Sequence, residues 1–217
     1  MNVSLIYKIQ TAVLSVIGDM QCFGWKHPLW FAWSPRGYQL KGEDYRIVKK
    51  LIQPGDILLQ RYEAWIDKIF IPGFFNHAGI YIGGEKEQVV HAISEGVLVE
   101  DIINFMRTDH LIVLRTNKEF ADKAIEKALS IIGSEYDFSF DFTNSRRFSC
   151  TEVIDFCFPG LLERKKYFGR PTVTPDSIAE NKNFTKIFDS RDEFKINRTK
   201  LIRFRSKKTQ KEKLFTI

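Results

Sequence analysis

A cysteine and a histidine that lie far apart in the chain occupy two short segments suited to thiol chemistry. Cys150 lies in the segment Phe-Ser-Cys-Thr-Glu at 148–152, and His77 opens an apolar segment that ends at Gly83. Because the thiolate is the reactive form, a catalytic cysteine needs an imidazole within hydrogen-bond reach and is helped by a helix N-terminus. The two segments offer both, and they predict a cysteine nucleophile and its base.

A helix is predicted to begin at Cys150. Ser149 is a good N-cap residue, and Val153, Ile154 and Cys157 share one helical face with Cys150. In the first turn, the unpaired N–H groups and the positive end of the helix dipole lower the pKa of a thiol and hold an oxyanion. The alternative interpretation is that Cys150 is buried like an apolar residue, as most free cysteines are. For Cys157 we adopt that interpretation.

His77 is predicted to lie at the start of a strand. Apolar residues alternate along 78–82, two glycines form a turn, and residues 88–93 supply the antiparallel return strand. His91 on the return strand then lies across from His77 or diagonal to it. It is the candidate third member of the site, the group that orients the imidazole of His77.

A series of motifs resembles the YiiX/YebB-like branch of the NlpC-type cysteine hydrolases, which are related to the lecithin:retinol-acyltransferase-like proteins. In chain order they are Pro54-Gly55-Asp56-Ile57-Leu58-Leu59, Asn76 to Gly83, His91-Ala92 with Gly96-Val97, Gly133 with Tyr136-Asp137, Ser149 to Val153, and Val173 to Asp176. The resemblance covers about residues 40–190 and implies an α+β, circularly permuted papain-like fold. In such a fold the histidine strand of an antiparallel sheet precedes the cysteine helix, with the nucleophile at the helix N-terminus.

The resemblance places the nucleophile on Cys150 and the base on His77. It implies a hydrolase that cleaves a peptide, cell-wall peptide or N-acyl amide bond through a thioester acyl-enzyme. Tyr136, upstream of the cysteine as a tyrosine is in related hydrolases, is the candidate oxyanion or substrate-positioning residue. Many members of the branch have a glutamate where this sequence has His91, whereas lecithin:retinol-acyltransferase-like proteins have a histidine. Glu95 is the alternative orienter of His77 if the strand register differs.

Two other functions are open at this point. A lipid acyl hydrolase or acyltransferase would use the same cysteine and histidine. It is favoured by His91 and by the basic tail. The phenylalanine clusters at 70–75 and 138–142 are expected to pack in the core; the alternative is that they line an apolar cleft for an acyl chain or a bulky peptide side chain. A non-catalytic module that binds a membrane or a peptide is the third interpretation. The expected partner is accordingly a peptide or a lipid-like substrate.

Length and composition fit one catalytic domain with an extension at each end. The 217 residues are 44% hydrophobic, which is enough for a sizeable core. We predict a helix and aromatic-rich extension over 1–40, the permuted papain-like domain over 41–190, and a basic tail over 191–217. Within the domain, the patterns predict helices over 45–51 and 118–132 and strands over 57–60 and 111–114.

The positive charge is concentrated in the tail. Between Lys195 and Lys213 there are nine basic side chains and one acidic side chain, a net charge of +8. The whole chain has a formal net charge of +6, so the remainder carries −2. Such a tail is either a solvated end or is attracted to an anionic membrane surface, worth about 1 kcal/mol per basic residue. No specific nucleic-acid partner is predicted.

Cysteine usage and the absence of other motifs set the expected compartment and cofactors. Three cysteines suggest no disulfide framework and favour a reducing compartment. Residues 1–18 fit an amphipathic helix better than a signal peptide, and no stretch has the length of a transmembrane helix. We therefore expect a cytoplasmic protein, with peripheral membrane attachment as an alternative. Without ligands at zinc-site spacing or a phosphate-binding glycine loop, no cofactor and no metal are expected.

Overall fold

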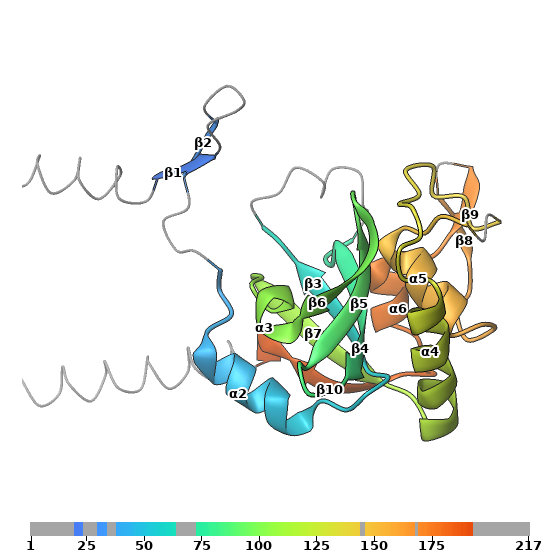
Figure 1. Ribbon diagram of the computed structural model, residues 1–217, viewed down its shortest axis with the longest axis horizontal. Helices are drawn as coiled ribbons and strands as arrows, with labels where there is room; N and C mark the ends of the chain where they lie inside the picture. The colour runs from blue at the N-terminus through green and yellow to red at the C-terminus, as the bar shows by residue number, and fades with distance from the viewer. Residues whose placement is uncertain are drawn as a thin grey trace, which may run out of the picture. The chain divides into compact units, whose positions relative to one another are not determined.

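Figure 1 shows the computed structural model of the protein as a ribbon. The described ranges are 38–63, 73–143, 146–167 and 169–192, together with the backbone of 20–23 and 30–33. The chain divides into two compact units, Met1–Gln39 and Leu40–Ile217, and each is described by itself.

The first unit contains a pair of antiparallel strands. Strand β1 (Met20–Phe23) pairs with β2 (Trp30–Trp33), and Met20 lies opposite Trp33. No strand is predicted there from the sequence, because four residues give a weak alternating pattern. The predicted helix over 1–18 and the basic run from Lys195 onward lie outside the described residues.

The second unit is built on a mostly sequential antiparallel sheet. Within the described residues the sheet has six strands in the order β10-β7-β3-β4-β5-β6. They are β3 (Ile57–Arg61), β4 (His77–Gly83), β5 (Gln88–Ile93), β6 (Gly96–Asp101), β7 (His110–Arg115) and β10 (Thr185–Asp189). A short separate pair, β8 (Lys165–Tyr167) and β9 (Arg170–Thr172), follows the cysteine helix in the chain.

Helices cover both faces of this sheet (Figure 1). Helices α4 (Lys118–Ser130), α5 (Cys150–Cys157) and α6 (Pro175–Ala179) lie on one side, and α2 (Gly42–Leu51) and α3 (Ile102–Phe105) lie on the other. Because successive strand residues point to opposite faces, Ile57 and Leu59 pack with α4, α5 and α6 while Leu58 packs with α2 and α3. The expected α+β class is confirmed.

The helix ends show which local signals set the boundaries. Helix α4 begins after Asn117, whose side chain accepts a hydrogen bond from Phe120 N at 3.1 Å. The sequence pattern predicts this helix to residue 132, whereas α4 ends at Ser130. The chain turns there, and Gly133 adopts a left-handed φ of 86°. Helix α2 begins at Gly42, three residues before the predicted start. No helix in the described ranges combines the length and the apolar character needed to cross a bilayer.

Candidate active site

Helix α5 carries Cys150 in its first turn, as the sequence predicts. The backbone N–H of Ser149, the N-cap residue, donates to the Glu152 carboxylate at 2.6 Å, which is one half of a capping box. Burial raises the pKa of Glu152 to about 7. The start of the helix is therefore fixed by a hydrogen bond within the same four residues that supply the thiol.

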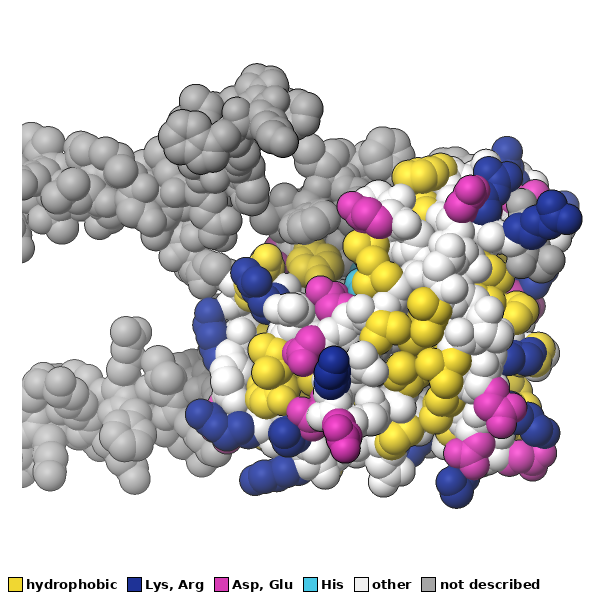
Figure 2. Space-filling model, viewed as in Figure 1, with side chains coloured by type: hydrophobic (Ala, Val, Ile, Leu, Met, Phe, Trp, Pro, Cys, Tyr) yellow, Lys and Arg dark blue, Asp and Glu magenta, His cyan; other side chains and the backbone are white. Residues whose placement is uncertain are grey.

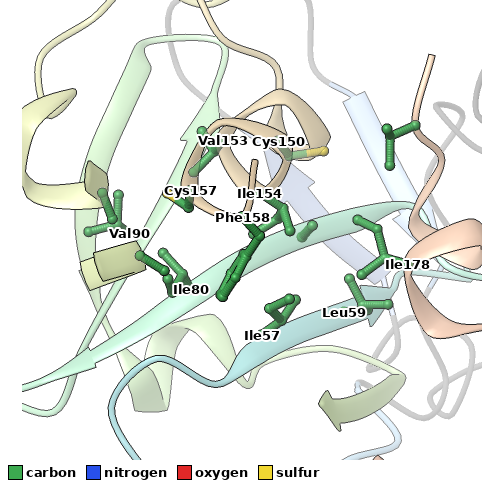
Figure 3. Close-up of a cluster of buried hydrophobic side chains, with 14 of the residues drawn as sticks. Ile57, Leu59, Ile80, Val90, Cys150, Val153, Ile154, Cys157, Phe158 and Ile178 are labelled. Carbon is green, nitrogen blue, oxygen red and sulfur yellow. The ribbon is translucent and has the colours of Figure 1, made fainter. Parts of the chain in front are cut away.

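The rest of α5 anchors this helix in the core. Figure 3 shows Cys150 and Cys157 at opposite ends of α5, and Ile154 and Phe158 pointing into a cluster that includes Ile80 of β4. Cys157 is 1% exposed, and burial raises the pKa of its thiol to about 12. The interpretation of Cys157 as a buried core residue is confirmed.

The Cys150 thiol is also buried, and this corrects one prediction. The sulfur lies beside the backbone N–H groups of Ala78 and Thr151, which lower the pKa of the thiol. Burial is the larger effect, and it raises the pKa of Cys150 to about 11. The lowering expected at a helix N-terminus is therefore outweighed by desolvation, and the resting side chain is a thiol at neutral pH.

The two predicted histidines form a hydrogen-bonded pair. His77 Nε2 lies 2.8 Å from His91 Nδ1, and the rings meet edge to face with centroids 5.1 Å apart. Burial, and then the proximity of His91, lower the pKa of His77 to about 3; burial lowers the pKa of His91 to about 4. Both imidazoles are therefore neutral near pH 7, so one ring of the pair donates and the other accepts.

The strand register explains why these two rings meet. Gly79 lies directly opposite His91 in the β4–β5 ladder, and His77 lies two residues before Gly79 on the same face. Diagonal neighbours of this kind are within reach of long side chains. A Cβ at Gly79 would lie 2.8 Å from Val89 Cγ1 and 2.9 Å from the Phe105 ring, so only glycine fits without a shift of its neighbours. Phe105 packs against both histidine rings.

The structure brings the cysteine and histidine segments together through β4. The Cys150 sulfur lies beside the N–H of Ala78, the residue that follows His77. Among the hydrogen bonds of the described residues, none joins the thiol to His77, and the thiol interacts with backbone groups instead. Hydrogen bonds between catalytic groups are often long in unliganded enzymes. His77 bonds to His91 through Nε2, which leaves Nδ1 as the ring nitrogen available to a thiol.

Asp176 holds the segment before His77, although the sequence motif that contains it indicated no role for it. Asp176, in α6, accepts hydrogen bonds from the backbone N–H groups of Phe74 and Phe75 at 2.6 and 2.8 Å. A Cβ at Gly73 would lie 2.4 Å from Asp176 Oδ2, so the carboxylate fits closely against the backbone. Asp176 thus sets the path of the chain into β4.

The remaining candidates lie in different places. Tyr136 is partly buried, and its ring is tilted by 59° against the Phe138 ring with centroids 4.7 Å apart. It belongs to a segment beside the residues that precede Cys150. Glu95 is exposed in the turn between β5 and β6, where it accepts a hydrogen bond from Ser94 Oγ at 2.6 Å. The alternative that Glu95 orients His77 is wrong, because the register pairs His91 with Gly79 and directs Glu95 into a turn.

Sequence reasoning missed one acidic residue near the histidines. Glu100 Oε2 in β6 lies 3.3 Å from His91 Nε2. The signal available in the sequence was the two-residue turn at 94–95, which fixes the register of β6 against β5. In the described ranges no group of three or more His, Cys, Asp or Glu side chains is arranged to hold a metal ion.

Known proteins resemble this chain in fold and in sequence. The fold is similar to the crystal structure of metalloprotein yiiX from Escherichia coli O157:H7, with a TM-score of 0.54 and 20% identity over 64% of this chain and 97% of that one. The word metalloprotein describes that protein, and the likeness concerns the fold. No curated protein matches the chain. Residues 51–188 match the model of the permuted papain-like amidase enzymes, YaeF/YiiX, C92 family. Because this match spans more than half of the chain and includes both β4 and α5, the protein belongs to that family of permuted papain-like amidases, which confirms the expected YiiX-like branch.

Proposed function

We propose that the protein hydrolyses an amide bond of a peptide, a cell-wall peptide or an N-acyl compound through a thioester on Cys150. Membership of a cysteine amidase family sets the reaction class. The observation that carries the residue assignment is the 2.8 Å hydrogen bond between His77 and His91 on the strand whose Ala78 N–H contacts the Cys150 sulfur. In this proposal Cys150 is the nucleophile, His77 the base, and His91 the group that orients His77.

The first step transfers a proton within a neutral pair. The pKa of Cys150 is raised to about 11 and that of His77 is lowered to about 3, so the thiol and the imidazole are both uncharged before substrate binds. The thiol therefore loses its proton to His77 Nδ1 as the sulfur attacks the substrate carbonyl carbon. The new S–C bond and the imidazolium form together, without a thiolate that persists in the free enzyme.

The negative charge on the carbonyl oxygen needs donors at the start of α5. The N–H of Cys150 belongs to the first turn, where N–H groups have no partner within the helix. We assign this group to the oxyanion, with Tyr136 as the second donor. His77 then gives its proton to the departing amine. In the second half a water molecule, deprotonated by His77, cleaves the thioester and releases the acid.

Hydrolysis or transfer of a lipid acyl group is the second candidate. The observation that favours it is the neutral imidazole of His91 as the third group, in place of the glutamate of many YiiX-like proteins. Phe138, which is 71% exposed and contacts the Tyr136 ring, adds an apolar side chain near the cysteine segment. The chemistry at Cys150 is the same for an ester, so only the substrate separates the two candidates.

Attraction to an anionic membrane through the basic tail is a further part of the proposal. On the face shown in Figure 2, acidic and basic side chains are interspersed, with hydrophobic side chains between them. The concentration of positive charge that supports the proposal is in the sequence, where nine basic residues lie between Lys195 and Lys213. Binding to vesicles with and without an anionic lipid, with the full chain and a form truncated before Lys195, tests it.

Acylation by an activated ester tests the residue assignment without knowledge of the substrate. Treatment with p-nitrophenyl butyrate should add one butyryl group to Cys150, detected by intact mass and located by peptide mapping. Cys157→Ser is the matched control and should still be acylated, whereas Cys150→Ser should not. His77→Gln should slow acylation by about 10²–10⁴-fold, the usual contribution of a general base. Acylation of Cys150 at an unchanged rate in His77→Gln would contradict the assignment and favour a binding module.

Substrate panels then separate the two candidate reactions. N-acyl amino acid p-nitroanilides report amide hydrolysis, and phospholipid vesicles analysed for released fatty acid report lipid acyl hydrolysis. Turnover of the amide set alone supports the first candidate. Turnover of the lipid set alone would replace it with the second.

A further inference from the structure

Three polar side chains form a diagonal line across three neighbouring strands. His77 on β4 is diagonal to His91 on β5, because Gly79 is the residue opposite His91. His91 is in turn opposite Leu98 on β6, and Glu100 lies two residues beyond Leu98 on the same face. The contacts along this line are 2.8 Å from His77 Nε2 to His91 Nδ1 and 3.3 Å from His91 Nε2 to Glu100 Oε2.

A neutral histidine pair of this kind has two proton arrangements. In the first, His77 carries its proton on Nε2 and donates to His91 Nδ1, which leaves His77 Nδ1 with a free lone pair. In the second, His91 donates from Nδ1 to His77 Nε2, and the His77 proton lies on Nδ1. Only the first arrangement lets His77 Nδ1 accept the thiol proton of Cys150.

We propose that Glu100 is a positioning residue that holds the His77–His91 pair in the first arrangement. This inference rests on the proposed function, in which His77 Nδ1 is the base. In the first arrangement His91 carries its own proton on Nε2, which lies 3.3 Å from Glu100 Oε2. In the second arrangement Nε2 carries a lone pair instead, and its negative partial charge at that distance from the same carboxylate is repulsive.

The surroundings of His91 make this effect strong. The ring is 4% exposed, and Nε2 has no hydrogen-bond partner among the described residues. At 3.3 Å the Glu100 contact is longer than a regular hydrogen bond, so its influence on the pair is chiefly electrostatic. Little water is available to screen it at so buried a ring. The Glu100 side chain itself is 34% exposed, so the carboxylate keeps contact with water.

The surroundings of Glu100 act on its pKa in opposite directions. Burial and the nearby Asp101 raise the pKa of Glu100, while Arg107 lowers it. The Glu100 carboxylate also supplies the negative charge that His91, the third group of the site, lacks. When His77 takes the thiol proton it becomes positively charged, and its hydrogen-bond partner, His91, is a neutral imidazole. The negative charge of Glu100 lies next to the other ring nitrogen of His91 and helps to stabilise the imidazolium. In this protein His91, together with Glu100, thus takes the place of the single glutamate that many related proteins have at the third position.

The variant Glu100→Gln removes the charge and keeps the side-chain size. Glu95→Gln is the matched control, because Glu95 is an exposed glutamate in the turn that joins the same two strands. We expect acylation of Cys150 by p-nitrophenyl butyrate to slow by about tenfold in Glu100→Gln, the lower end of the loss seen when outer partners of functional histidines are removed. The apparent KM for the ester should not change, and Glu95→Gln should match the unmodified protein.

The proton arrangement can be measured without any substrate. Long-range ¹H–¹⁵N correlation spectra of ¹⁵N-histidine-labelled protein distinguish a ring protonated on Nε2 from one protonated on Nδ1. We expect both rings in the Nε2–H form in the unmodified protein and in Glu95→Gln, and a population in the Nδ1–H form in Glu100→Gln. Glu100→Asp should restore most of the Nε2–H form, which keeps the test available if Glu100→Gln unfolds.

Each outcome decides one question. An unchanged arrangement in Glu100→Gln, or a changed arrangement with an unchanged acylation rate, would overturn the role of Glu100. Absence of Cys150 acylation in the unmodified protein would overturn the proposed function instead, because the spectra report the histidine protons independently of acylation.

Discussion

The raised pKa of Cys150 makes a quantitative prediction about the reactivity of the free enzyme. With a pKa of about 11, roughly one thiol in 10⁴ is ionised at pH 7, compared with about three in 100 for an ordinary cysteine with a pKa near 8.5. The ratio is about 300-fold. The more basic thiolate is intrinsically about 13-fold more nucleophilic, since a Brønsted coefficient near 0.45 acts over about 2.5 pKa units. Cys150 should therefore react about twentyfold more slowly than a free thiol at pH 7, and limited access to its buried sulfur can only slow it further.

Thiol–disulfide exchange with 4,4′-dithiodipyridine measures this difference. The protein and N-acetylcysteine are treated in parallel from pH 6 to pH 10, and peptide mapping assigns the label to each cysteine. The rate at Cys150 should rise about tenfold per pH unit over the whole range, because ionisation remains incomplete at pH 10. Cys157, with a pKa of about 12 and 1% exposure, provides the internal comparison and should react more slowly still.

A different profile would refute this reasoning. A rate at pH 7 that equals or exceeds that of N-acetylcysteine, with a plateau below pH 9, would indicate a thiolate–imidazolium pair in the resting enzyme. In that case His77→Gln should abolish the plateau. If the thiol and imidazole are neutral, as the buried geometry implies, His77→Gln leaves this exchange rate nearly unchanged while it slows acylation.

Three further predictions concern the elements that position the site. Gly79→Ala should lower the free energy of unfolding, measured with urea, by about 1–3 kcal/mol, the usual cost of overpacking, because the new Cβ would lie 2.8 Å from Val89 Cγ1. The control Gly42→Ala should show no such loss, because the nearest atom to its new Cβ is 3.8 Å away. Asp176→Asn should cost about 2 kcal/mol by the same assay, since it weakens two charge-assisted hydrogen bonds to backbone N–H groups, whereas the exposed Asp122→Asn should cost less than about 0.5 kcal/mol. The two site histidines have pKa values lowered to about 3 and 4, so between those values and 6.5 the unfolded chain binds more protons than the folded one. The free energy of unfolding should therefore fall as the pH is lowered from 6.5 toward 4, and His77→Gln should weaken that dependence; equal slopes in both proteins would contradict the lowered pKa of His77.

The positions of Cys150 and the two histidines could be predicted because their signals are local. Ser149 and Glu152 form a cap within four residues, so the start of α5 follows from the sequence alone. The turn at Gly83 and Gly84, whose φ values are 74° and 83°, fixes where β4 ends and β5 returns, and with it the diagonal relation of His77 to His91.

The electrostatics of the site could not be predicted in the same way, because they depend on contacts between distant segments. The helix N-terminus at Cys150 favours a thiolate, but the packing of α5 against β4 removes water from the sulfur and reverses the net shift of the pKa. The role of Asp176 likewise depends on a contact made about a hundred residues away along the chain, which no periodicity in the sequence reports.

The position of Cys150 and the raised pKa of its thiol together suggest how the enzyme would limit unwanted reactions. A thiol that stays protonated at rest reacts slowly with disulfides and other electrophiles, since only the thiolate attacks them readily. Reactivity would then arise only when a bound carbonyl carbon lies against the sulfur and the new oxyanion is held at the start of α5. For this to work, His77 Nδ1 must already be free of a proton when the substrate arrives. In the proposed arrangement, the diagonal from His77 through His91 to Glu100 would supply that condition before substrate binds. The carboxylate at the end of this diagonal would then govern whether the first proton transfer takes place.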